Sequence, residues 1–292
     1  MRVVVAGSSG FLGSALVTHL RGAGHDVLRL VRRAPAAADE RGWDPPAGKI
    51  DAGALDGADA VVNLCGAPLW TRRWSGARKQ VLIDSRVEPT EVLASAVAEH
   101  GIPVLLNQSA VGYYGDTAGG PHGESAPRGE GFAAQLCERW EQATAAAAGA
   151  RVVLLRTAPV LAAGGGMLAP LRPLFTVALG ARLGDGRQHM PYIHVADLNA
   201  ATAFLLESDV EGPVNLTGPT PATNAEFTKA FAAARRRPAP FSVPRPAMRL
   251  AMGELADDLL RGQHLVPTAL SGAGFEFRYP TVRAALADTE RG

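Results

Sequence analysis

The chain has 292 residues, a length that fits about two domains or one large α/β unit. Apolar residues make up 47% of it and charged residues 20%, so it can bury a sizeable core and is not a disordered chain. Its 29 Lys and Arg nearly balance its 28 Asp and Glu, and the resulting net charge of +1 speaks against nucleic acid or an anionic membrane as a partner.

The cellular setting is indicated by cysteines and by the absence of long apolar runs. Cys65 and Cys137 share no CxxC or Cys/His spacing, which speaks against a disulfide framework and a metal site. Residues 1–7 have no basic region or cleavage site, so they read as a strand and not as a signal peptide. No stretch approaches the roughly 18 apolar residues of a membrane span. We therefore expect a soluble, cytoplasmic protein.

The first 31 residues predict one strand–helix–strand unit. Residues 3–6 are apolar and mostly β-branched, as in a strand buried on both faces of a parallel sheet. A glycine turn follows over residues 7–13, and apolar residues then recur at helical spacing up to residue 20. Residues 22–24 end the helix, and residues 27–31 form the next strand. This is a βαβ crossover.

The alternation of strands and helices continues along the chain. Strands are expected at residues 60–64, 104–107 and 152–155, with helices near 79–99 and 132–148. This order predicts an α/β fold with a Rossmann-like, doubly wound parallel sheet and a smaller carboxy-terminal substrate lobe. Gly- and Pro-rich segments divide the chain. We expect the sheet domain at residues 1–163 and 190–218, and the lobe at 164–189 and 219–292.

The glycine turn indicates a dinucleotide site. Gly7 allows a tight turn off the strand, Gly10 lets the backbone approach a pyrophosphate, and Gly13 lets the helix pack close to the sheet. The helix amino terminus offers free N–H groups to phosphates. No Gly-Lys-Ser/Thr follows and no G-x-S-x-G is present, which speaks against a triphosphate site and a hydrolase elbow.

Two arginines at the end of the second strand indicate which dinucleotide is bound. An acid at this place hydrogen-bonds the ribose 2′-hydroxyl of NAD, whereas arginine accommodates the 2′-phosphate of NADP. Here the strand ends with Arg32 and Arg33, and Asp26 lies too early to reach the ribose. NADP is therefore expected, and NAD is the weaker alternative.

Several motifs together resemble one protein family. The G-x-x-G-x-x-G spacing, NLCG at residues 63–66 and Ser109 just after the fourth strand resemble the extended short-chain dehydrogenase/reductase superfamily. SAVGYYG at 109–115, RRW at 72–74, LCERWE at 136–141 and GFEFRYP at 274–280 resemble its branch of epimerase-family proteins with a carboxy-terminal domain of unknown function, some of them labelled cell-division inhibitors. The resemblance covers essentially the whole chain.

The resemblance implies a set of cofactor contacts and a catalytic group. The expected cofactor-binding residues lie in the glycine turn, at the second strand end and after the third strand: Gly7, Ser9, Gly10, Phe11, Leu12, Gly13, Arg32, Arg33, Cys65 and Gly66. The superfamily also uses a Ser, a Tyr and a Lys on a carbonyl or carbinol, with the Lys four residues after the Tyr lowering the pKa of the phenol. Ser109 fits the position of the serine.

The tyrosine–lysine pair itself is missing. No Tyr in the chain has a Lys four residues later, and Ala133 and Cys137 stand where the superfamily would place the pair. Either Tyr113 or Tyr114 transfers the proton beside Ser109, with Arg156 or the cofactor ribose as the positive neighbour, or the protein binds NADP without ordinary dehydrogenase chemistry.

The sequence therefore predicts an NADP-binding oxidoreductase or nucleotide-sugar-epimerase-like enzyme acting on an unknown small molecule. The alternative is a catalytically weak, NADP-responsive binding or regulatory protein. Two further motifs carry side chains that could be functional or structural: Glu124 as a carboxylate acid/base or a loop acid, and His194 with Asp197 as organisers of the fold. The arginines of the RRW motif are compatible with an anionic substrate, because arginine binds carboxylate or phosphate. Proteins of the superfamily often pair through two helices, so the resemblance is also compatible with a homodimer.

Overall fold

Strand β1 (Arg2–Ala6) lies inside an eight-stranded sheet in the computed structural model, which describes residues 1–69 and 72–291. Trp70, Thr71 and Gly292, the last residue of the predicted lobe, lie outside the described residues. The strand order is β13-β8-β6-β5-β1-β2-β3-β4, and all neighbours pair in parallel except β3 and β4.

The bounds of the other sheet strands follow the apolar runs of the sequence. They are β2 (Asp26–Val31), β3 (Glu40–Asp44), β4 (Lys49–Ile50), β5 (Ala60–Asn63), β6 (Val104–Ala110), β8 (Arg151–Thr157) and β13 (Gly212–Leu216). Val3, Val4 and Val5 are fully buried, because helices cover both faces of the sheet. This confirms the predicted doubly wound sheet.

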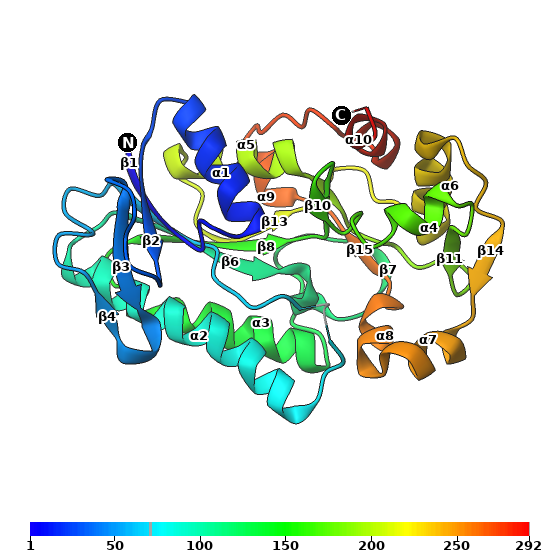
Figure 1. Ribbon diagram of the computed structural model, residues 1–292, viewed down its shortest axis with the longest axis horizontal. Coiled ribbons are helices and arrows are strands. Elements are labelled where there is room, and N and C mark those ends of the chain that lie inside the picture. The colour runs from blue at the N-terminus through cyan, green and yellow to red at the C-terminus, as the bar shows by residue number, and fades with distance from the viewer. Residues whose placement is uncertain (70–71, 292) are drawn as a thin grey trace.

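Two pairs of helices form the outer layers. Figure 1 shows α1 (Phe11–Gly22) and α5 (Val195–Glu207) on one face, and α2 (Gly76–Glu99) and α3 (Phe132–Gln142) on the other. One core packs Leu16 and Leu205 against Val5, and the other packs Leu93 against Val4. The chain crosses from one half of the sheet to the other between β1 and β5, and ligands bind at the carboxyl ends of the strands at such a switch point.

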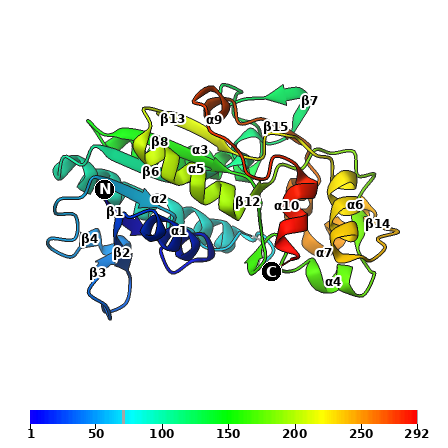
Figure 2. The same ribbon diagram turned by 90° about the horizontal axis from the view of Figure 1, so that it is seen from above.

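The remaining elements gather mostly at the end of the molecule opposite β2, β3 and β4 (Figure 2). They are β9 (Val160–Ala162), β10 (Gly165–Gly166), β11 (Ala181–Leu183), β12 (Ile193–His194), β14 (Phe241–Val243), α4 (Arg172–Thr176), α6 (Asn224–Arg235), α7 (Arg245–Met252), α8 (Glu254–Leu259) and α10 (Val282–Thr289). Phe175, Phe231 and Leu286 join α4, α6 and α10 in a core of their own.

Short elements connect this part to the sheet. β7 (Thr117–His122) pairs with β15 (Gln263–Leu265), and α9 (Thr268–Gly272) follows β15. Three 3-10 turns complete the fold: η1 (Pro45–Ala47), η2 (Val111–Tyr114) and η3 (Ala143–Ala146).

Some predicted bounds were wrong. β6 extends to Ala110, so Ser109 lies inside the strand and not after it. The strand expected at 60–64 ends at Asn63, and the helix expected at 79–99 begins at Gly76, where the Ser75 side chain accepts a hydrogen bond from the backbone of Arg78. The helix expected to reach residue 148 ends at Gln142 and continues only as η3.

Candidate functional site

The glycine turn between β1 and α1 is held by close backbone contacts. Gly7 has a φ of +78°, and a Cβ on it would lie 2.8 Å from the Leu64 carbonyl carbon. A Cβ on Gly13 would lie 2.2 Å from the Gly7 carbonyl oxygen. Both positions therefore need glycine for the fold itself.

Gly10 differs from the other two glycines. Its φ is −74°, it is exposed, and a Cβ on it would meet only the Gly7 carbonyl oxygen, at 3.3 Å. That single contact is tight, but neither a positive φ nor a contact below 3.0 Å forces a glycine at this position. A ligand whose phosphates approach the turn closely accounts for a glycine here.

The amino terminus of α1 is free to bind an anion. Gly10 is its N-cap, no side chain among the described residues caps it, and its first turn has no acidic residue. The first backbone N–H groups of a helix and its positive dipole end attract phosphate. Ser9 beside them is exposed, Leu12 is half-buried, and the ring of Phe11 rests against Gly165 of β10.

A buried polar network holds the loop after β5. The Asn63 side chain donates to Thr90 Oγ1 at 2.9 Å and to Asn107 Oδ1 at 2.7 Å, and its oxygen accepts from the Cys65 backbone N–H. Burial raises the pKa of the Cys65 thiol to about 12, against the opposing charge of nearby Arg32. Cys65 is thus an unreactive neighbour of the turn, and Gly66 beside it is exposed.

Arg86 braces the same loop from α2. It is buried, it donates to the carbonyls of Ala67 and Leu82 at 3.1 Å, and its guanidinium lies 5.0 Å from the centre of the Trp140 ring. A Cβ on Gly66 would lie 3.1 Å from the guanidinium carbon. Nothing in the sequence around Arg86 had indicated this role.

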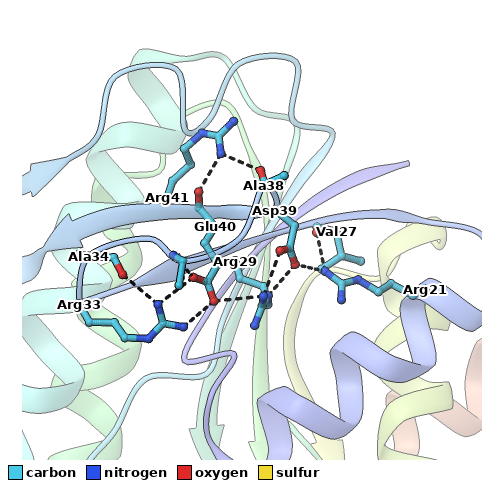
Figure 3. A network of polar contacts seen from close by, with 10 residues as sticks. Arg21, Val27, Arg29, Arg33, Ala34, Ala38, Asp39, Glu40 and Arg41 are labelled. Atoms are coloured by element: carbon cyan, nitrogen blue, oxygen red, sulfur yellow. Dashed lines mark hydrogen bonds and ion pairs between the residues drawn. The ribbon is translucent and has the colours of Figure 1, made fainter.

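Arg32 and Arg33, at the end of β2, have different surroundings, and Figure 3 shows those of Arg33. Arg33 forms two hydrogen bonds with the buried Glu40 carboxylate, at 2.8 and 2.6 Å, which lock β2 to β3. Arg29 binds Asp39 and also lies 3.1 Å from Glu40. Arg32 is exposed and makes no hydrogen bond or ion pair with a residue in the described ranges.

The predicted catalytic Ser109 belongs to a buried ion-pair network. Its hydroxyl is fully buried and donates to Glu141 Oε1 at 2.6 Å. Arg156 pairs with both oxygens of Glu141 at 2.8 Å. Glu141 lies at the end of the LCERWE motif, but its partnership with Ser109 and Arg156 was not predicted from the sequence.

Tyr113 and Tyr114 both contact this network and differ in exposure. Tyr114 is 2% exposed, and its hydroxyl accepts from Arg156 at 2.9 Å and donates to Asn215 at 2.7 Å. Burial raises the pKa of Tyr114 to about 12. Tyr113 is half-buried, and the Arg156 guanidinium lies 3.5 Å from the centre of its ring. Tyr113 is therefore the more accessible phenol.

The positions at which the tyrosine–lysine pair was expected are packed with small side chains. Ala133 and Cys137 are 4% and 3% exposed, and a Cβ on Gly112 would contact both. The Cys137 thiol donates to the Ala110 carbonyl at 3.5 Å, and burial raises its pKa to about 12. Neither residue can supply an acid or a positive charge.

Three other polar residues of the sequence motifs hold backbone groups. Glu124 accepts from the N–H groups of Asn215 and Ala269, and Asp197 accepts from the successive N–H groups of Arg278 and Tyr279, shortly before α10. His194 accepts from the Ala196 N–H at the start of α5. Among the described residues there is no His, Cys, Asp and Glu cluster suited to a metal ion, and none of their helices is long and apolar enough to cross a membrane.

Comparison with known proteins covers nearly the whole chain. Residues 3–217 match the NAD dependent epimerase/dehydratase family, and residues 243–289 match a domain of unknown function (DUF1731). An epimerase family protein from Mycobacterium bovis is 55% identical over 288 residues, which cover 97% of this chain and 96% of that protein.

Two solved structures extend the comparison. The human epimerase family protein SDR39U1, crystallised with NADPH, superposes with a TM-score of 0.92 at 32% identity, over 100% of this chain and 99% of that one. A nucleoside-diphosphate sugar epimerase from Corynebacterium glutamicum reaches a TM-score of 0.82 at 34% identity, over 99% of this chain and 58% of that one.

Proposed function

Because this chain belongs to the NAD dependent epimerase/dehydratase family, we propose that it binds NADP and transfers hydride to or from a small-molecule carbonyl or carbinol, as an oxidoreductase or an epimerase. The observation that carries the proposal is the uncapped amino terminus of α1 above a glycine turn in which Gly10, unlike Gly7 and Gly13, has neither a positive φ nor a contact below 3.0 Å that forces it to be glycine. The NADPH bound to the human relative supports the same cofactor.

The choice of NADP over NAD rests in this proposal on Arg32. Arg33 is paired with Glu40, whereas Arg32 has no partner among the described residues and lies close enough to Cys65 to affect its pKa. An arginine binds phosphate through charge-assisted hydrogen bonds. We assign Arg32 to the 2′-phosphate and Arg33 to the support of β3.

Tyr113 is the proposed acid. Bound NADPH would supply the hydride to the carbonyl carbon. The Tyr113 phenol gives its proton to the carbonyl oxygen, and the positive charge of Arg156 over the ring stabilises the phenolate that remains. Glu141 fixes Arg156 through two hydrogen bonds, and Ser109 in turn fixes Glu141. In this scheme Ser109 and Tyr114 act by positioning Arg156.

The second candidate is a slow, NADP-responsive binding or regulatory protein. The small buried side chains at Ala133 and Cys137 favour it, because they leave no phenol and no ammonium at the usual positions. The hydroxyls of Ser109 and Tyr114 are also already hydrogen-bonded inside the protein. Two free cysteines are compatible with a reducing compartment, and we place the protein in the cytoplasm in either case.

Calorimetric titration with NADPH and NADH, followed by NADPH turnover on a panel of carbonyl compounds, tests the proposal. Wild type should prefer NADPH. Gly10→Val should keep its thermal unfolding profile and lose both dinucleotides, because the valine side chain would occupy the space of the phosphates. Retained binding in a folded Gly10→Val protein would place the phosphates elsewhere. NADPH binding without turnover on any compound would favour the second candidate.

A further inference from the structure

The ring of Phe11 joins the glycine turn to strand β10. Phe11 is the first residue of α1 and directly follows Gly10. A Cβ on Gly165 would lie 2.7 Å from both Cδ2 and Cε2 of the Phe11 ring, and a Cβ on Gly166 would lie 3.3 Å from its Cε1. The ring therefore packs closely against the backbone of β10, which belongs to a segment much later in the chain.

The three successive glycines of that segment are glycines for different reasons. Gly166 has a φ of +63°, and a Cβ on it would lie 2.3 Å from the Val160 carbonyl oxygen, so the local backbone requires it. A Cβ on Gly164 would have no atom of the described residues within 4 Å, apart from its chain neighbours. Gly165 has no positive φ, and the three atoms nearest to its Cβ position are all carbons of the Phe11 ring. The Phe11 ring is thus what requires a glycine at residue 165.

Phe11 lies outside the core under its own helix. Leu16 and Leu20 of α1 are buried there and Leu12 packs beside them, whereas Phe11 is 38% exposed. Its ring contacts β10 from the amino-terminal end of α1, where the free N–H groups lie. The contact with β10 and the proposed phosphate site therefore share one residue.

The strand that Phe11 contacts leads directly into the carboxy-terminal core. β9 and β10 form an antiparallel hairpin over residues 160–166, and the Met167 N–H donates to the Val160 carbonyl at 3.0 Å. The next residue, Leu168, is fully buried in the core around Phe175 of α4. A single residue thus separates β10 from this core.

We propose that Phe11 is a positioning residue that couples NADP binding at the glycine turn to the order of the β9–β10 hairpin. The inference rests on the proposed function, because it takes the amino terminus of α1 as the phosphate site. Phosphates held by the first N–H groups of α1 would fix the backbone of Phe11, and with it the ring against Gly165. Because such coupling is reciprocal, a hairpin packed on the ring favours cofactor binding to the same extent. Bound cofactor would thereby order the entry to the part of the molecule that we expect to hold the substrate.

Hydrogen–deuterium exchange with and without saturating NADPH tests the coupling. In wild type, NADPH should slow exchange about threefold or more in peptides that cover residues 7–13 and in peptides that cover residues 160–168. In Phe11→Ala the turn should still be protected, whereas the hairpin should exchange at the same rate with and without NADPH. Calorimetry on the same variant should show NADPH affinity lowered about fivefold or more, the lower end of the usual range for coupled sites.

Alanine at two neighbouring glycines supplies a matched pair of variants. Gly165→Ala places a methyl group in the space of the Phe11 ring, so it should lower NADPH affinity and hairpin protection as Phe11→Ala does. In the Phe11→Ala background the same change should have no further effect, because the ring that it meets is absent. Gly164→Ala should behave like wild type in both measurements, because its methyl group meets open space. Thermal unfolding checks that each variant is folded, and if Gly165→Ala alone is not, Phe11→Ala and the double variant still decide the question.

The outcomes separate this inference from the cofactor proposal. If the hairpin of Phe11→Ala is still protected by NADPH, or if Gly165→Ala lowers affinity equally with and without Phe11, the coupling is overturned and the cofactor site stands. If wild type binds NADPH but protects only the turn, the coupling is likewise overturned. If wild type does not bind NADPH in calorimetry, the cofactor site and the coupling fall together.

Discussion

At the scale of single residues, Arg32 and Arg33 are adjacent in sequence but have separable tasks. We expect Arg32→Ala to lower NADPH affinity about 10- to 150-fold, the loss of one charge-assisted contact worth roughly 1.5–3 kcal/mol, and to leave NADH affinity nearly unchanged. Arg33→Ala should affect NADPH less, because its guanidinium already binds Glu40. Calorimetric titration of both variants with both cofactors measures the difference. An equal loss of NADPH and NADH in Arg32→Ala would contradict the assignment.

Substitutions of the two neighbouring tyrosines should have different effects: loss of the Tyr114 hydroxyl should lower stability, and loss of the Tyr113 hydroxyl should lower activity. Tyr114→Phe removes two buried hydrogen bonds, one from Arg156 and one to the Asn215 side-chain oxygen, and we expect it to cost about 1–3 kcal/mol of unfolding free energy. Tyr113→Phe should unfold like wild type.

Turnover should follow the opposite pattern. Once a substrate is found, Tyr113→Phe should lose about 10²–10⁴-fold in kcat, the usual contribution of a positioned acid. Thermal unfolding and steady-state kinetics of the two variants and of Arg156→Lys, at saturating NADPH, give both readouts. A larger loss of kcat in Tyr114→Phe than in Tyr113→Phe would reverse the roles.

At the scale of elements, strand β3 depends on ion pairs. It lies at residues 40–44, reads E-R-G-W-D, and has little of the alternation that identifies a strand. Figure 3 shows what holds it beside β2: Arg29 and Arg33 bind Asp39 and Glu40. The strand was therefore absent from the sequence prediction.

Acid should weaken this attachment. Hydrogen bonds from Arg33 and from the Ala36 N–H lower the pKa of Glu40 from 4.5 to about 2. A carboxylate with a lowered native pKa stabilises the fold fully above pH 4.5 and loses that contribution as the pH falls towards 2. Glu40→Gln should thus be less stable than wild type at pH 7, and the difference should shrink between pH 4.5 and 2. Urea unfolding at several pH values tests this, and a constant difference would exclude the Glu40 charge as its cause.

Local pattern accounts for what the sequence could predict of the elements. The strand, glycine turn and helix of residues 2–22 are adjacent, so apolar runs and helical spacing were sufficient to find them. β7 reads T-A-G-G-P-H and pairs with β15 more than 140 residues later, which no local pattern encodes. The candidate site shows the same division. Ser109, the tyrosines and Arg156 as their positive neighbour were proposed from the sequence, but the role of Glu141, which reaches Ser109 and Arg156 from α3, was not.

At the scale of the whole molecule, contacts between segments far apart in the sequence join the start of α2 and the loop before it to α7 and α8. Arg73 donates to the Leu250 and Ala251 carbonyls of α7, and Lys79 pairs with Glu254 of α8. The sequence had suggested that the arginines of the RRW motif could bind an anionic substrate. In the structure, Arg73 instead binds backbone carbonyls of α7. The predicted boundaries of the lobe stay a prediction. The two family models match residues 3–217 and 243–289, so residues 218–242, which contain α6, belong to neither match.

Glu290, just after α10, joins three helices of the carboxy-terminal part. Its side chain is buried, and its carboxylate binds Arg172 of α4 at 2.9 Å and Arg235 at the end of α6 at 2.5 Å. Glu290→Gln would leave two partly buried guanidinium groups without a countercharge. Because both arginines retain some contact with water, we expect a loss of about 2–3 kcal/mol, below the 3–5 kcal/mol typical of a fully buried pair.

This variant should lower the melting temperature by several degrees, since about 1 kcal/mol corresponds to roughly 2–4 °C in a domain of this size class. NADPH affinity should change little, because the hydrogen bonds and ion pairs of Glu290 itself go to Arg172 and Arg235 and not to the glycine turn or Arg32. Arg172→Met combined with Arg235→Met and Glu290→Met is the matched control: it removes all three charges and should recover much of the lost stability, since no buried charge is left alone. If the triple variant is less stable than Glu290→Gln, the ion pairs themselves hold α4, α6 and α10 together; if it is more stable, the cost in Glu290→Gln arises from the unpaired arginines.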